Sequence, residues 1–157
     1  MKNFLKVASI AAFVAVPMQS NANENIPFSG TVTGACVINV GANGVMAATT
    51  DLQTFGSTVT GGSAGTASVL SNGGGFNLFV NPVTSFDNEP VADVASTETF
   101  TASYGATGAT SAPTGTTGST PVNAGNTSVT VDLVAVKSGA DVFAAGSYDA
   151  TVVLRCE

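Results

Sequence analysis

The sequence contains two cysteines, Cys36 and Cys156, which stand near opposite ends of the chain. An even number of cysteines in an exported domain predicts a disulfide bond. A bond between these two would close a loop of about 120 residues, for which the chain-entropy model gives roughly 5 kcal/mol of stabilisation. We therefore expect a fold whose first and last strands meet.

The N-terminal residues predict that the protein is exported. Two lysines precede an apolar run at residues 7–16, and small residues follow up to Ala22. This is the pattern of a secretory signal peptide, and its apolar run is far shorter than the roughly 20 residues that cross a bilayer. We assign residues 1–22 to a signal peptide and residues 23–157 to a single domain, with no membrane insertion after cleavage.

Apolar residues alternate with a period of two at both ends of this domain. The residues that share one phase are Ile26, Phe28, Val32 and Cys36 at one end, and Tyr148, Ala150, Val152, Leu154 and Cys156 at the other. Alternate residues of a strand face the same side, so both cysteines are predicted to face the core from the first and last strands. A shift of one residue in either strand would turn its cysteine outward.

Short segments with the same alternation, separated by Gly, Asn and Pro, fill the region between the two ends. They are residues 37–40, 51–55, 66–70, 75–80, 97–104 and 128–136. No stretch after the signal peptide has sustained helical periodicity. Seven or eight short strands joined by turns predict an all-β antiparallel sandwich. We expect residues 105–126, which are rich in Thr and Gly, to form an exposed loop.

Charge excludes several kinds of partner. Residues 23–157 carry all ten carboxylates but only two basic residues, Lys137 and Arg155, which gives a formal charge of −8. So acidic a chain cannot neutralise phosphates, and we expect neither nucleic acid nor an anionic lipid surface as a partner.

Catalysis is also not expected, because the sequence has no histidine. Histidine is the usual general base and the commonest metal ligand, and the two cysteines are predicted to be bonded. Asp87, Glu89 and Asp93 form a weak candidate for a calcium site, with a solvated acidic turn as the default interpretation. We expect a protein that is not an enzyme and binds no cofactor.

Three segments resemble chaperone-usher pilins and the related spore-coat-U-like secreted subunits. Residues 26–38 read Ile-Pro-Phe-Ser-Gly-Thr-Val-Thr-Gly-Ala-Cys-Val-Ile and look like the opening strand of those proteins. Residues 144–154 read Ala-Ala-Gly-Ser-Tyr-Asp-Ala-Thr-Val-Val-Leu and resemble their closing strand, and residues 52–56 resemble an internal Leu-x-x-Phe-Gly segment. The middle third of the chain matches only in general β-character.

The resemblance implies an immunoglobulin-like sandwich that lacks its final strand, with a hydrophobic groove between its first and last strands. In that family a periplasmic chaperone lends a strand to the groove, an outer-membrane usher assembles the subunits, and the N-terminal extension of the next subunit then fills the groove. It implies a structural subunit of a surface fibre, or fimbria, that contributes to adhesion or biofilm and is exported through the periplasm to the cell surface. The candidates for the groove and for strand exchange are Ile26, Phe28, Val32, Tyr148, Ala150, Val152 and Leu154.

Two features depart from the family pattern. Only residues 23–27 precede the Phe28 strand, and five residues at about 3.3 Å each are too short to fill a neighbour's groove. Either the chain is a terminal, assembly-stopping or non-polymerising member, or part of its first strand is released and serves as the donor. In addition, the usual pilin disulfide joins the first strand to the end of the second, whereas here the second cysteine is Cys156.

Two other functions stay open. A stand-alone secreted module that binds glycan or protein would need an exposed aromatic platform, and with no Trp and Tyr148 in core phase, only Tyr104 could supply it. A secreted hydrolase ranks last, because the sequence offers no nucleophile–base pair.

Overall fold

The computed structural model describes residues 26–73, 75–93 and 97–157. The predicted signal peptide, residues 1–22, lies outside these ranges. The chain divides into two compact units, Met1–Thr31 and Val32–Glu157, and all the strands of the described residues belong to the second. The described residues include no helix long and apolar enough to span a membrane.

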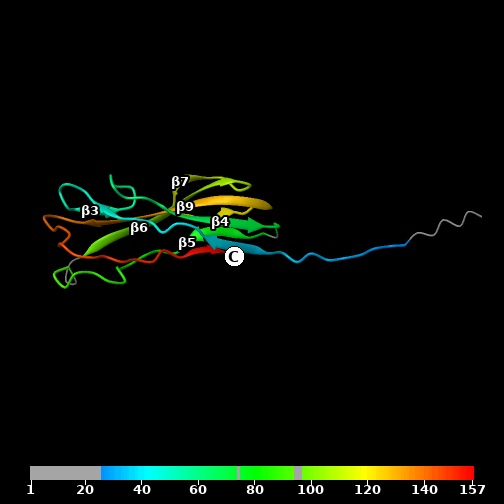
Figure 1. Cartoon of the computed structure of the whole chain (residues 1–157), viewed down its shortest axis with the longest axis horizontal. Helices are drawn as coiled ribbons and strands as arrows, with labels where there is room; N and C mark the ends of the chain where they lie inside the picture. The colour runs from blue at the N-terminus through cyan, green and yellow to red at the C-terminus, as the bar shows by residue number, and fades with distance from the viewer. Residues whose placement is uncertain (1–25, 74, 94–96) are drawn as a thin grey trace, which may run out of the picture. The chain divides into compact units, whose positions relative to one another are not determined.

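All regular structure in the described residues is β-strand, which confirms the prediction of an all-β fold (Figure 1). The strands are β1 (Cys36–Val40), β2 (Ala47–Ala48), β3 (Thr54–Gly56), β4 (Gly65–Ser71), β5 (Asn77–Val80), β6 (Glu98–Gly108), β7 (Ala112–Thr116), β8 (Thr120–Pro121), β9 (Gly125–Lys137) and β10 (Leu154–Cys156).

The strands form two antiparallel sheets. In the larger sheet β9 is central: one of its edges pairs first with β4 and then with β3, and the other pairs along its length with β6. The outer strands of this sheet are β1 beside β4, β2 beside β3, and β7 beside β6. The smaller sheet has the order β10-β5-β8. Antiparallel pairing throughout is consistent with the predicted sandwich type of fold.

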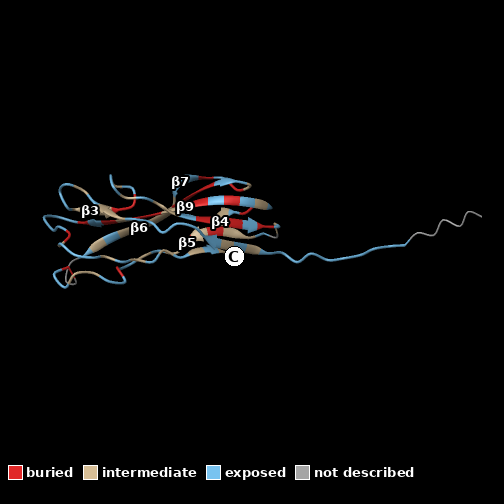
Figure 2. Cartoon of the chain, in the orientation of Figure 1, coloured by how far each residue is buried: buried red, intermediate tan, exposed pale blue. Residues whose placement is uncertain are grey.

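Apolar side chains from both sheets share one core. Figure 2 colours the buried stretches of the chain red. Val69 of β4 and Val129 of β9 meet Leu78 of β5, and all three are fully buried. Tyr104 of β6 is also fully buried, and its hydroxyl donates to the Leu78 carbonyl at 2.9 Å. Tyr104 therefore cannot be the exposed aromatic platform that a stand-alone binding module would need.

The expectation of a loop at residues 105–126 was wrong, although many of these residues are exposed as predicted. Within this segment β6 ends, β7 and β8 form, and β9 begins. Hydroxyl groups supply hydrogen bonds that large apolar residues could not. Thr110 is buried, and its hydroxyl oxygen accepts a hydrogen bond from the Asn123 backbone N–H at 2.9 Å. The backbone N–H of Thr110 donates to Thr127 Oγ1 at 3.0 Å. A Thr- and Gly-rich composition is thus compatible with a packed region.

The predicted first strand is shorter than expected. Residues 26–35 contain no strand, and the side chains of Ile26, Phe28 and Val32 are 74%, 94% and 86% exposed. The physical reason lies in β4, the partner of β1, which ends at Ser71. Glycines with φ of +88° at residue 73 and +80° at residue 75 then redirect the chain, so no partner strand continues beside residues 26–35.

Candidate functional site: an open groove beside the disulfide

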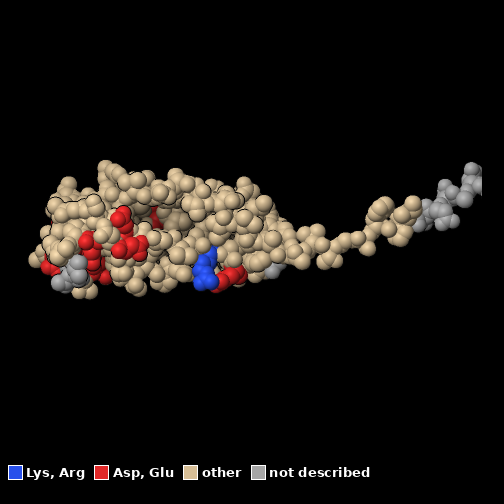
Figure 3. Space-filling model, turned by 60° about the horizontal axis from the view of Figure 1, so that its bottom comes forward, with Lys and Arg blue, Asp and Glu red and all other residues tan. Residues whose placement is uncertain are grey.

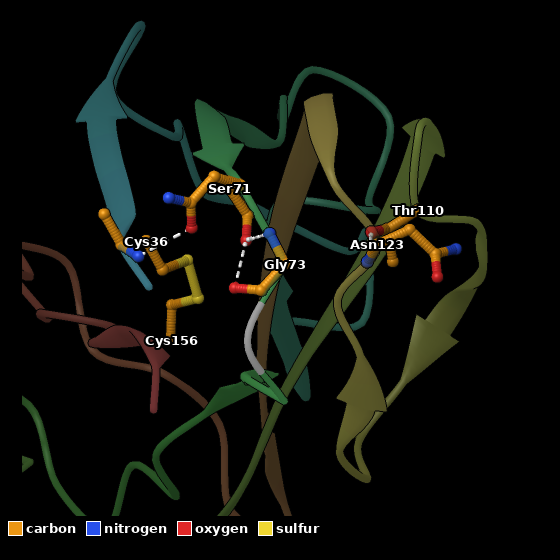
Figure 4. Close-up of a disulfide and its surroundings, with 8 residues drawn as sticks. Cys36, Ser71, Gly73, Thr110, Asn123 and Cys156 are labelled. Atoms are coloured by element: carbon orange, nitrogen blue, oxygen red, sulfur yellow. Dashed lines mark hydrogen bonds between the residues drawn. A yellow bond between two sulfur atoms is a disulfide. The ribbon is translucent and has the colours of Figure 1, made fainter. Parts of the chain in front are cut away.

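The predicted disulfide is present between Cys36 and Cys156 (Figure 4). Its two Cα atoms lie 6.2 Å apart, and the bond connects residues that are 120 positions apart in sequence. Cys36 begins β1 of the larger sheet, and Cys156 ends β10 of the smaller one. The bond therefore links the two sheets at the edge where the first and last strands meet.

A groove of about 900 Å³ lies beside this bond, between β1 and the C-terminal segment. One wall comes from β1 and the residues after it, from Ile38 to Met46, and the other wall from residues 148–154. Phe55, Val131 and Leu133 of the larger sheet also line it. The groove is mainly apolar, with Asp87 and Asp149 among its polar lining residues.

The groove is open because both of its walls are strand-like segments with a partner on one side only. The strand β1 pairs with β4 alone. Opposite it, Leu154–Cys156 pairs with β5, and the Val153 carbonyl accepts the Asn81 N–H at 2.9 Å. Among the described residues no strand lies between these walls. Backbone groups along an unpaired edge readily accept a further strand.

The predicted groove residues fall into two groups. Tyr148, Ala150, Val152 and Leu154 all line the groove. The expected closing strand is formed only at Leu154–Cys156. Burial nevertheless alternates along residues 148–154, because these four side chains are half-buried and Thr151 and Val153 between them are exposed. Ile26, Phe28 and Val32 are not part of the groove lining; they are the exposed residues of the strandless segment described above.

Aromatic rings pack at the Tyr148 end of the groove. The Tyr148 ring centroid lies 5.1 Å from that of Phe55, 5.0 Å from that of Phe86 and 5.7 Å from that of Phe143. The Tyr148 hydroxyl donates to the carboxylate of Asp93. Burial raises the pKa of the Tyr148 phenol far above its usual value of about 10, and the hydrogen bond to Asp93 and the negative charge of Asp93 raise this pKa further.

Behind these rings lies a buried group of charges that sequence reasoning missed. Lys137 Nζ is 2.9 Å from Asp93 Oδ1 and 3.5 Å from Glu98 Oε1, and the three side chains are 1%, 4% and 9% exposed. Burial opposes ionisation of Asp93, but hydrogen bonds from Lys137, Tyr148 and the Ala144 N–H outweigh it and lower the pKa of this carboxyl. The signal was present in the sequence, because Lys137 continues the inward phase of Val129, Leu133 and Ala135.

The weak calcium candidate is not supported. Asp93 faces Lys137, and Asp87 accepts a hydrogen bond from Thr151 Oγ1 at 2.7 Å. In the described part of the chain no three His, Cys, Asp or Glu residues gather as a metal-binding group. Elsewhere the surface in view is mostly uncharged: most of its acidic side chains gather toward one end of the β-domain, and another lies beside the basic side chain farther along (Figure 3).

The raised pKa of Tyr148 predicts a loss of stability at alkaline pH. The unfolded chain releases the phenolic proton near pH 10, and the folded chain retains it, so deprotonation favours unfolding as the pH rises above about 10. Urea unfolding at pH of about 9 and 11 should show this decrease. The Tyr148→Phe variant should show a smaller one, and an equal decrease in both proteins would contradict the assignment to Tyr148.

No protein-family model, curated protein or solved structure matches the chain.

Proposed function

We propose that this protein is a structural subunit of a bacterial surface fibre and that its groove accepts residues 26–32 of a second copy as an added strand. The observation that carries the proposal is the coexistence of an open apolar groove and an unpaired segment with alternating apolar side chains. Each feature lacks a partner within the described chain. Adding a strand would satisfy both, because backbone hydrogen bonds supply affinity and alternate side chains enter the groove.

The lengths of segment and groove agree. The C-terminal wall spans residues 148–154, which is seven residues or about 23 Å when extended. Residues 26–32 have the same number, and Ile26, Phe28, Gly30 and Val32 share one face when the segment is extended. The donor is therefore not restricted to the five residues before Phe28. The part of the expected first strand that has no partner is long enough to serve.

A second copy is favoured over the chain's own segment. To enter its own groove, the segment would have to reverse direction just before Cys36. That stretch is held by Asn72, whose Oδ1 accepts the Ala35 N–H at 2.7 Å and whose Nδ2 donates to the Thr33 carbonyl at 2.7 Å. Donation from one copy to the groove of the next is a head-to-tail contact, and such contacts generate open filaments when they do not close into a ring.

The remaining parts of the proposal follow from the same groove. An immunoglobulin-like sandwich that lacks its final strand would expose apolar surface during export, and exposed strand edges promote aggregation. A periplasmic chaperone that occupies the groove and an outer-membrane usher that exchanges it for the next subunit would prevent this. The fibre would then act in adhesion or biofilm at the cell surface, with other copies of the subunit as its main partners.

Two neighbouring substitutions test the donor segment. Phe28→Asp replaces a side chain that would enter the groove, and Ser29→Asp adds the same charge on the opposite face. Burying a Phe side chain contributes about 1.5–3 kcal/mol, so Phe28→Asp should weaken subunit association by about ten- to a hundredfold or more. We expect SDS-resistant ladders on unboiled gels for the wild type and for Ser29→Asp, and monomers for Phe28→Asp.

The groove side has its own matched pair. Val152→Asp changes a residue of the groove lining, and Val37→Asp changes an exposed valine of β1 that is not part of this lining. Only the first should abolish the ladder. A wild-type protein that stays monomeric at high concentration, with residues 26–32 unprotected from hydrogen exchange, would refute the proposal and favour a stand-alone binding module. Protection of residues 26–32 in a monomer would show instead that the chain fills its own groove.

A further inference from the structure

The buried charges behind the aromatic rings form an arrangement that can make a covalent bond. Lys137 lies at the end of β9, Glu98 begins β6, and Asp93 precedes β6 in sequence. The Lys137 amine contacts the Asp93 carboxyl at 2.9 Å and lies 3.5 Å from Glu98. We propose that Lys137 and Asp93 condense to an intramolecular isopeptide bond, with Glu98 carrying the proton. This inference does not depend on the proposed fibre function.

The surroundings hold the Lys137 amine against the Asp93 carboxyl in a buried, aromatic site. The Phe143 ring centroid is 4.8 Å from Lys137 Nζ, and Phe86 and Tyr148 belong to the same aromatic cluster. In such a site of low polarity a proton can pass from Lys137 to Asp93, which replaces two buried charges by a neutral amine and a neutral acid. The ion pair is the resting form and the neutral pair its minor form. Holding the two groups in contact corresponds to effective molarities of about 10⁵ M or more.

Hydrogen-bond donors are in place for the transition state. The Ala144 N–H lies 3.0 Å from Asp93 Oδ2, and the Tyr148 hydroxyl donates to the same oxygen. These two donors would stabilise the negative charge that develops on Oδ2 when the amine attacks the carboxyl carbon. Lys137 Nζ also donates to the Val142 carbonyl at 3.2 Å, which helps to fix the orientation of the amine. Lys137 Nζ approaches from the side of Oδ1, the oxygen that would leave.

The atoms and charges of the step balance. The lone pair of neutral Lys137 Nζ forms a bond to Asp93 Cγ, and the nitrogen loses one proton to the Glu98 carboxylate. Glu98 returns this proton to the leaving Oδ1 hydroxyl, the Cγ–Oδ1 bond breaks, and one water molecule is released. Glu98 is again a carboxylate at the end of the step. No oxidation takes place and no co-reactant is needed.

The bond would connect the end of β9 to the residue at position 93. Both ends of the link lie at the end of the groove where Tyr148 packs, whereas the disulfide lies at the Leu154 end. A domain with both links would resist extension at both ends of its open edge. Such a cross-link suits a protein that must bear force without unfolding.

Mass spectrometry of the exported, reduced protein tests the proposal. The isopeptide bond lowers the mass by about 18 Da, the mass of the released water, relative to the sequence. It also blocks trypsin at Lys137, which is one of only two basic residues after residue 22. We expect the mass loss and no cleavage after Lys137. After a second digestion with chymotrypsin, which cuts at aromatic residues such as Phe100 between the two positions, we expect a fragment spectrum that joins the peptides containing Lys137 and Asp93.

Conservative variants assign the roles of the three residues. Lys137→Arg should restore the full mass, and Glu98→Gln should do so or slow the mass loss by at least tenfold. Asp93→Asn offers an independent readout, since condensation would then release ammonia and lower the mass by about 17 Da instead of 18. If any variant fails to fold, the wild-type digest still decides. Full wild-type mass together with cleavage after Lys137 would show a simple ion pair and overturn the proposal.

Discussion

Replacing both Cys36 and Cys156 by serine is expected to lower the free energy of unfolding by about 5 kcal/mol. The bond closes a loop of 120 residues, and removing it lets the unfolded chain regain the entropy of that loop. Domains of this size are stable by only about 5–15 kcal/mol, so the variant should be partly or largely unfolded at physiological temperature. Urea unfolding of the two proteins measures the difference.

The wild-type protein after reduction is the matched comparison for this variant. Its stability should fall by nearly the same amount, because reduction breaks the same bond without changing any other residue. The groove should also become less well defined, since the bond joins β1 of one sheet to β10 of the other at one end of the groove. A loss below about 1 kcal/mol in both proteins would show that residual structure already holds the ends of the unfolded chain together.

Replacing Lys137 by methionine is expected to be almost as damaging, measured against wild-type protein in which Lys137 and Asp93 have not condensed and form an ion pair. The substitution removes the ammonium group that contacts Asp93 and Glu98, although both carboxylates are almost fully buried. Removing one partner of a buried ion pair costs about 3–5 kcal/mol, because the other charge stays desolvated. The contact of the ammonium with the Phe143 ring is lost as well. Urea unfolding near neutral pH measures the loss.

Arg155→Met provides a matched control for Lys137→Met. Arg155 pairs with Glu157 at 2.7 Å, but the two side chains are 46% and 56% exposed. Exposed pairs contribute about 0–1 kcal/mol, so this variant should unfold almost like the wild type. Equal effects of the two substitutions would show that burial does not set the strength of the Lys137 cluster.

The stability of the wild type and that of Lys137→Met should also respond to acid with opposite sign. In the wild type with a free carboxyl, the lowered pKa of Asp93 contributes stability above about pH 4 that is lost as the pH falls further. In Lys137→Met, protonation removes a buried negative charge that has lost its contact with the ammonium group, so the destabilisation relative to wild type should shrink between pH of about 7 and 4. A gap that stays constant over this range would contradict the role given to the charges.

Local patterns were sufficient for much of the fold. Alternation along β4, β6 and β9 identified strands that the structure contains, because period-two burial needs no knowledge of the partner strand. The phase of Cys36 and Cys156 likewise predicted their bond. The same reasoning failed at residues 105–126, where small and hydroxylated residues pack through hydrogen bonds that composition does not reveal.

The candidate site shows the limits of local patterns more clearly. Alternation at Tyr148, Ala150, Val152 and Leu154 predicted their shared face, and these residues do line the groove. Alternation at Ile26, Phe28 and Val32 predicted a strand of the same domain, but these residues are exposed and unpaired. The pattern alone cannot say whether the partner strand belongs to the same chain. The cluster of Lys137, Asp93 and Glu98 joins residues whose proximity no local spacing indicates.

The sequence by itself determined the all-β class, the pairing of the two cysteines and the faces of most strands, because these depend on residue type and on a backbone period that is local. Only the tertiary structure decided where β1 begins, that the edge beside it stays open, and which charges are buried together. Those features depend on where β4 ends and on contacts between strands far apart in the chain. Local periodicity carries no information about either.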